Sequence, residues 1–211
     1  MANRDDPDIH HRRSLRLTGY DYSQAGAYFV TICSRSRECI LGCVDDGEMR
    51  LNNAGCMVQV VWDDIPSHYA GIDTDAFIIM PNHIHAIIVI VGAAPCGRPD
   101  SDDGQARGPA PTGNTTLSLA DVVHRFKTMT TKRYADGVKQ IGWPAFSGHL
   151  WQRNYYEHVI RDEDDLNRIR QYVMDNPARW AEDENNPDRL GQLVNVRIES
   201  TSPWSLQGRI V

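Results

Sequence analysis

Two histidines stand two positions apart in an aliphatic segment, and this spacing predicts a metal site. Within residues 76–91, His83 and His85 interrupt an almost entirely apolar run. Side chains two positions apart on a β-strand lie on the same face, so both rings could bind one cation, while Ile84 points the other way. The alternative is a pair of core histidines with hydrogen-bonded rings, which is the usual interpretation of a single buried histidine. Two histidines on one strand face favour the metal site.

A second group of polar residues lies in a predicted helix at residues 164–176, which acidic residues precede and Pro177 ends. Its apolar stripe places Tyr172 and Asn176 one turn apart on the flank of the buried side. Two imidazoles alone suit zinc, copper, iron or manganese and require a third ligand. The Asn176 oxygen could supply that ligand while the Tyr172 phenol stands beside the ion. Taken alone, Tyr172 would instead be interpreted as a packed aromatic.

The order and spacing of several motifs resemble the REP-associated tyrosine transposases, within the His-hydrophobic-His (HUH) endonuclease superfamily. The motifs are Met80-Pro81-Asn82-His83-Ile84-His85, Phe126-Lys127, residues 151–161 (WQRNYYEHVIR) and residues 172–177 (YVMDNP). The resemblance spans about residues 12 to 180. It implies a ferredoxin-like α+β core, a divalent metal held by the two histidines, and a tyrosine that attacks DNA. Single-tyrosine transposases of the insertion-sequence type often carry Gln where this chain has Asn176, and Asn is similar to the REP-associated branch.

For this chain the resemblance implies attack by Tyr172 on a phosphodiester, which leaves a 5′-phosphotyrosine and a free 3′-OH. Phosphate chemistry with His and Asn ligands favours Mg²⁺ or Mn²⁺, and Mn²⁺ suits imidazole better. Tyr155 or Tyr156 could be the nucleophile instead, but Tyr172 has Asn176 at a ligand spacing. A domesticated regulator that binds hairpins without cutting them and a metal-dependent hydrolase that uses water are the alternative functions.

Two further residues could support the chemistry. Glu157 and His158 could assist the metal or move a proton, and His158 could protonate the leaving oxygen. They could equally be structural partners at the edge of the sheet.

The net charge of −6 disfavours a DNA partner, but the basic residues are clustered, and such clusters could bind DNA. Residues 124–161 contain seven Lys and Arg residues against two acids, and a basic cluster precedes residue 17. The expected partner is single-stranded or hairpin DNA resembling REP palindromes, bound by a monomer or a homodimer. The predicted DNA-binding residues are Arg12, Arg13, Arg16, Arg125, Lys127, Lys132, Arg133 and Arg153.

The pattern of elements predicts an α+β, ferredoxin-like (RRM-like) antiparallel sheet with helices packed on one face and His-x-His on a central strand. Residues 1–180 are expected to form one catalytic domain with a flexible insertion at about 92–116, rich in Gly, Pro, Ala and Ser. Residues 181–211 are expected to form a C-terminal extension. No segment reaches the ~18 apolar residues of a membrane span, and the polar N-terminus does not resemble a signal peptide, so a cytoplasmic protein without membrane partners is expected.

Overall fold

The computed structural model describes Leu17, residues 19–91, 117–183 and 185–187, and the backbone of residues 196–202 and 205–210. The predicted insertion at 92–116 lies outside the described residues, as do Arg12, Arg13 and Arg16 of the predicted N-terminal basic cluster.

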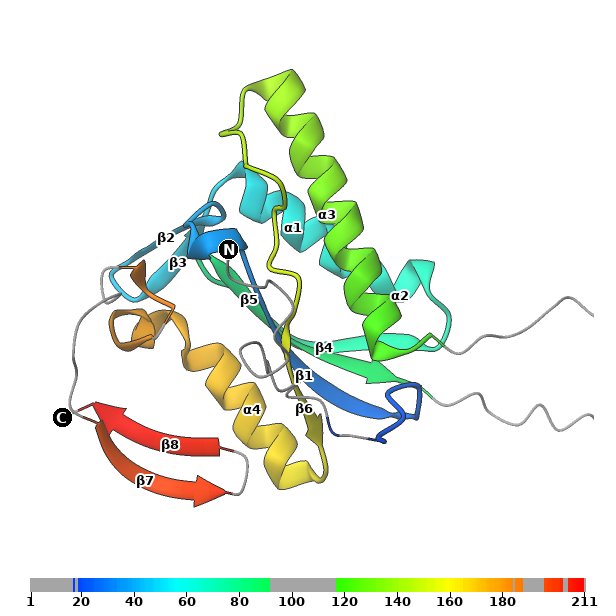
Figure 1. Ribbon diagram of the computed structural model, residues 1–211, viewed down its shortest axis with the longest axis vertical. Coiled ribbons are helices and arrows are strands. Elements are labelled where there is room, and N and C mark those ends of the chain that lie inside the picture. Colours follow the sequence, from blue (N-terminus) through cyan, green and yellow to red (C-terminus); the bar gives the residue numbers. More distant parts are fainter. Residues whose placement is uncertain are drawn as a thin grey trace, which may run out of the picture.

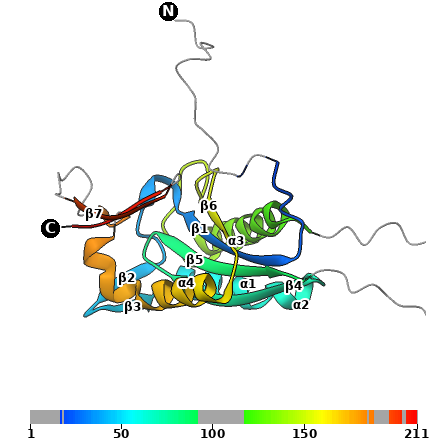
Figure 2. The ribbon, with the colours of Figure 1, turned by 90° about the horizontal axis from the view of Figure 1, so that it is seen from below.

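Among the described residues, four strands form the main sheet (Figure 1). They are β1 (Gly26–Cys33), β4 (Ile72–Ile79), β5 (His83–Ile90) and β6 (Tyr156–Ile160). Their spatial order is β4-β5-β1-β6, every neighbouring pair is antiparallel, and Figure 2 shows strands of this sheet running side by side. Helix α1 (Asn53–Asp63) lies between β1 and β4 in the chain, and α3 (Leu119–Ile141) lies between β5 and β6, which is the ferredoxin-like order. The predicted α+β antiparallel sheet with His-x-His on a central strand is confirmed.

The remaining elements surround this core. They are η1 (Arg35–Arg37), β2 (Gly42–Asp45), β3 (Glu48–Leu51), α2 (Ile65–His68), α4 (Glu163–Asp175), η2 (Pro177–Glu182), β7 (Val196–Ser202) and β8 (Ser205–Ile210). β2 pairs with β3, and β7 pairs with β8, each as an antiparallel hairpin. Of the helices that the structure describes, none is both long and apolar enough to cross a membrane.

Local sequence explains where the two long helices begin. Ser118 and Asp121 form a capping box at the start of α3, in which each side chain binds the other residue's backbone N–H. The Asp162 carboxylate accepts a 2.8 Å hydrogen bond from the Asp165 N–H at the start of α4. Three acidic residues in the first turn of α4 also favour its N-terminus, because the helix dipole is positive there.

The sheet has two covered faces (Figure 1). One face carries Val30, Ile88 and similar side chains, which pack with α1 and α3 in the large core. The other face carries Phe29 and Ile87, which pack with Ile169 and Val173 of α4. The prediction of helices on one face therefore holds for α1 and α3, whereas α4 lies on the opposite face. Both faces of β5 are buried, so its sequence alone gives no signal of which helix covers which face.

Candidate active site

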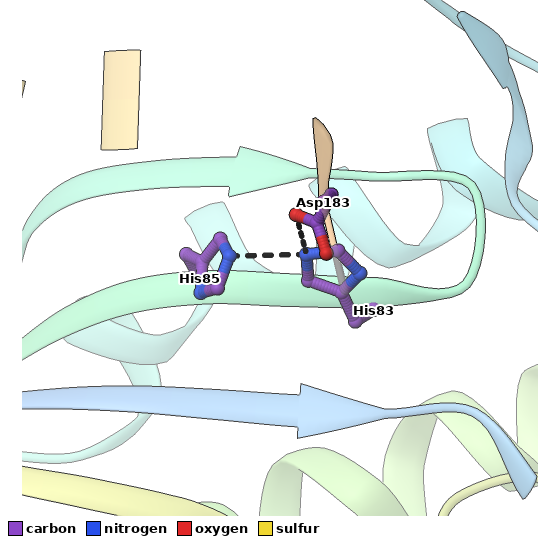
Figure 3. Close-up of side chains that lie close together, drawn as sticks. All are labelled: His83, His85 and Asp183. Carbon is purple, nitrogen blue, oxygen red and sulfur yellow. Dashed lines mark hydrogen bonds and ion pairs between the residues drawn. The ribbon is translucent and has the colours of Figure 1, made fainter. Parts of the chain in front are cut away.

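The two histidines of β5 converge on one point. His83 and His85 are buried on the same strand face, and their Nε2 atoms are 3.0 Å apart (Figure 3). Each Nδ1 atom has a hydrogen-bond partner of its own. His83 Nδ1 lies 2.9 Å from Asn82 Oδ1, and His85 Nδ1 lies 2.8 Å from the Thr31 hydroxyl on β1, the residue directly opposite it in the register.

These contacts determine which nitrogen of His83 carries its proton, and they leave two arrangements open for His85. The Asn82 amide nitrogen donates to the carbonyl oxygens of Arg37 and Asn185, so its oxygen must accept from His83 Nδ1–H. The His83 Nε2 atom therefore offers a lone pair. The Thr31 hydroxyl can donate or accept, so His85 can present Nε2 either as a donor to His83 or as a second lone pair. The second arrangement is that of two metal ligands oriented by their hydrogen bonds.

Burial keeps both rings neutral. It lowers the pKa of His83 to about 4, although the Asp183 carboxylate opposes this shift. Burial also lowers the pKa of His85 well below its usual value, and the neighbouring His83 adds to the effect. A neutral imidazole is the form that binds a metal ion, so the pair needs no deprotonation to act as ligands at neutral pH.

Asp183 completes a group that could hold a metal ion, although no spacing in the sequence links it to the histidines. Its Oδ2 atom lies 3.8 Å from His83 Nε2, and ligand atoms of His83, His85 and Asp183 all lie within 4.8 Å of one another (Figure 3). Its other oxygen accepts hydrogen bonds from the N–H and side-chain amide of Asn185. Asn185 in turn is tied to Asn82 by the 2.7 Å bond to its carbonyl oxygen, so the segment after η2 is anchored beside β5.

The predicted nucleophile lies beside the histidines. The Tyr172 hydroxyl is 3.4 Å from His85 Nε2, and the two rings are 5.1 Å apart. The Tyr172 side chain is 41% exposed, so a substrate can reach it. Asn176, one turn later, is buried, and its Oδ1 atom has no hydrogen-bond partner within the described part of the chain. A buried amide oxygen without a partner is costly, and a cation would satisfy it.

The chain is similar in sequence to two bacterial proteins. No protein-family model matches the chain. An uncharacterized protein of Haemophilus influenzae is 36% identical over 190 residues, which cover 87% of this chain and 98% of that protein, so the two belong to one family. Another Haemophilus influenzae protein, named "Putative REP-associated tyrosine transposase", is 25% identical over 159 residues, 75% of this chain and 74% of that protein.

The chain is thus similar in sequence to a REP-associated tyrosine transposase. A solved REP-associated tyrosine transposase bound to a REP hairpin overlaps this chain with a TM-score of 0.49 and 17% identity, over 78% of this chain and 73% of that one.

In this chain, the two predicted support residues, Glu157 and His158, have neighbours other than the histidines. Glu157 is opposite Val30 in the register, so its side chain is buried on the face of α1 and α3, away from the histidines. His158 lies on the histidine face, but its Nε2 atom is 2.8 Å from an Asp165 carboxylate oxygen of α4. His158 thus holds the first turn of the tyrosine helix, which corresponds to the structural alternative for this residue.

Several predicted DNA-binding residues lie on α3, on the face opposite the histidines. The Lys127 ammonium donates to three carbonyl oxygens, of Gln152, Arg153 and Asn154, so it holds the segment before β6. Arg125 lies over the Tyr69 ring at 4.7 Å. The basic surface of α3 is therefore separate from the candidate active site.

The other predicted basic residues differ in their surroundings. Arg133 is 3.5 Å from an Asp64 carboxylate oxygen. Lys132 and Arg153 are exposed. The basic residues of α3 could therefore form a second DNA-binding surface, but they do not line the candidate active site.

Proposed function

We propose that this chain is a metal-dependent endonuclease and transesterase that cleaves and rejoins single-stranded, hairpin-associated DNA through Tyr172. The observation that carries the proposal is the 3.4 Å distance between the Tyr172 hydroxyl and His85 Nε2, beside two neutral imidazoles and a carboxylate. Hairpin DNA resembling REP palindromes is proposed as the substrate because of the family relationship.

In the proposed reaction, the Tyr172 oxygen attacks phosphorus and the bond from phosphorus to the 3′ oxygen breaks. The products are a 5′-phosphotyrosine and a free 3′-OH. The phenol loses its proton and the leaving oxygen gains one, and the exposure of Tyr172 allows water to carry it. Because one phosphodiester replaces another, a 3′-OH can reverse the step, and no nucleotide cofactor is needed.

The proposed metal ligands are His83, His85 and Asn176, to which we add Asp183. The Asn176 oxygen, which has no hydrogen-bond partner among the described residues, and the facing imidazole nitrogens fit a cation. Two imidazoles with oxygen ligands suit Mn²⁺ or Mg²⁺. When bound, the ion supplies positive charge for a phosphate oxygen in the transition state. Thr31 and Asn82 orient the histidines for this task.

We also propose residues 1–180 as the catalytic domain of a cytoplasmic protein that acts as a monomer or homodimer. Residues 181–211 are then an extension whose first residues, through Asp183, serve the same site.

The test is incubation with single-stranded hairpins from the flanking genome in Mn²⁺ or Mg²⁺, followed by denaturing gels and peptide mapping. We expect a covalent adduct on Tyr172 that needs the metal and disappears in Tyr172→Phe. Tyr155→Phe and Tyr156→Phe are matched controls and should keep the adduct. An adduct on Tyr155 or Tyr156 would move the nucleophile, and a free 5′-phosphate without any adduct would favour the water-using hydrolase. Tight hairpin binding without cleavage would favour the regulator.

A further inference from the structure

A second half-exposed tyrosine lies on the histidine face. Tyr156 of β6 is opposite Thr31 in the register, and Thr31 is the residue that orients His85. The Tyr156 side chain is 44% exposed. Its ring is therefore open to solvent on the same face of the sheet as the candidate nucleophile.

One buried ring connects the two tyrosines. The Phe29 ring stacks on His85 at 5.5 Å with an interplanar angle of 22°. Tyr172 meets the Phe29 ring edge-on at 6.0 Å, and Tyr156 meets it edge-on at 6.2 Å. Two exposed phenol rings thus flank one buried stack, so the aromatic surface continues from the candidate site onto β6.

Tyr156 is poorly suited to be a second nucleophile. Burial, and then the Asp165 carboxylate, raise the pKa of Tyr156, so its phenol stays neutral. No proposed metal ligand lies one turn away, because Tyr156 is on a strand. A neutral aromatic ring held by a rigid strand is instead suited to stacking against a flat partner.

We propose that Tyr156 binds an unpaired nucleobase next to the phosphate that Tyr172 attacks. This inference rests on the proposed function, because a single-stranded substrate at Tyr172 must run past neighbouring surfaces with its bases unstacked. Stacking needs no particular base, since every base offers a π face, so the subsite favours single strands over duplex without reading sequence. The Phe29 ring packs edge-on against Tyr156, and the 44% exposure of Tyr156 leaves part of its surface to a base.

The experiment measures binding of fluorescent single-stranded dT12 by anisotropy, in a Tyr172→Phe background and without added metal, so that no cleavage occurs. Tyr156→Ala should weaken binding on the order of 5- to 150-fold, the range for the loss of one stacked base. Tyr156→Phe and Tyr156→Trp should retain affinity because they keep the ring. Tyr156→Leu keeps apolar volume without an aromatic face and should behave like Tyr156→Ala. Met174→Ala, which removes an exposed side chain of α4, is the control and should have no effect.

A second probe separates stacking from backbone contact. In the same Tyr172→Phe background, proteins with and without Tyr156→Ala should bind a twelve-residue abasic deoxyribose-phosphate oligomer equally, because it has no bases to stack. Equal affinity of these two proteins for dT12, or an equal loss on the abasic oligomer, would overturn the proposal. The assay needs neither metal nor adduct. If no adduct formed on Tyr172 but Tyr156→Ala still weakened dT12 binding, the proposed chemistry would be rejected and the base-binding role of Tyr156 would stand.

Discussion

The two faces of the main sheet are both buried, but their side chains differ in polarity. The face under α1 and α3 is covered by a large apolar cluster that includes Ile88, Trp62 and Phe126. The face under α4 has a smaller cluster, with four buried apolar residues in the described part of the chain, and beside them lie His83 and His85. The first face is suited to stabilise the fold, because it buries apolar side chains. The second is suited to carry a reactive site, because polar side chains take the place of apolar ones there.

The weaker apolar packing of α4 is supplemented by polar contacts at both edges of the sheet. Arg170 makes a two-point contact with Asp75 of β4, with nitrogen-to-oxygen distances of 2.9 and 2.6 Å. On the other edge, Asp165 binds His158 of β6 and is also paired with Arg168. A planar two-point contact constrains direction as well as distance, so these pairs orient the helix that carries Tyr172.

The sharpest test of the comparison is Tyr172→Phe. We expect complete loss of the covalent DNA adduct and a free energy of unfolding within about 0.5 kcal/mol of wild type, because a partly exposed hydroxyl adds little to stability. Urea denaturation and denaturing gels measure the two quantities on the same preparation. A large loss of stability would mean that Tyr172 is a packing residue, and it would contradict the assignment of stability to one face and of the reactive site to the other.

Adjacent residues of β5 allow a matched comparison of the faces. Ile87 points toward α4 and Ile88 toward α1 and α3, and both are fully buried. Each change to Ala should cost about 2–5 kcal/mol of unfolding free energy. Only Ile87→Ala should also slow adduct formation per folded molecule, because it removes packing beneath the tyrosine helix. Single-turnover assays at a temperature where both variants stay folded would check this. Equal slowing by the two variants would contradict it.

Metal binding should depend on Asp183 as well as on the histidines. We expect His83→Ala to weaken Mn²⁺ affinity roughly 10- to 100-fold or more, and Asp183→Asn and Asn176→Ala to weaken it less, since each keeps the imidazole pair. Titration calorimetry measures the affinity directly. Asp175→Asn changes an exposed carboxylate at the end of α4 and is the matched control. If Asp183→Asn bound Mn²⁺ as tightly as wild type, the carboxylate would not be a ligand.

The sequence could predict those parts of the site that follow from local periodicity. The i, i+2 spacing brings the histidines together, as the 3.0 Å contact confirms, and the i, i+4 spacing puts Tyr172 and Asn176 on one helix. Asp183 had no such signal, because it meets the histidines through a chain segment about 100 residues further on. The side of the sheet that Glu157 faces depends on strand register, and one residue of register reverses it.

The role of Lys127 was equally hidden from the sequence. A lysine in a basic helix resembles a phosphate ligand, and only the fold brings three carbonyl oxygens to its ammonium. The sequence could not predict the position of α4 either, since an amphipathic pattern shows which side of a helix is buried but not which face of the sheet covers it.

The smallest expected effect concerns the Asp75–Arg170 pair. Hydrogen bonds from Arg170 hold the pKa of Asp75 below its usual range, although burial opposes this. A carboxylate whose pKa is lower in the folded state stabilises the protein above its unfolded pKa of about 3.9, and the effect disappears as the pH falls through the folded value. Because the Asp75 and Arg170 side chains are 25% and 36% exposed, solvent screening keeps the contribution of this pair to stability small at pH 7.

Asp75→Asn should therefore be slightly less stable than wild type at pH 7 in urea, and the difference should disappear as the pH falls through the lowered pKa of Asp75, below which its carboxyl is as uncharged as the amide of the variant. Its adduct formation should slow more than that of Arg168→Gln, because Arg168 is the more exposed arginine and His158 still holds Asp165 in that variant. A stability difference that persists unchanged at low pH would show that Asp75 acts through packing at its bulge in β4 instead of through its charge. In that case the helix that carries Tyr172 would be positioned mainly by its apolar cluster and by the contact between His158 and Asp165, and Ile87→Ala should slow adduct formation more than Asp75→Asn does.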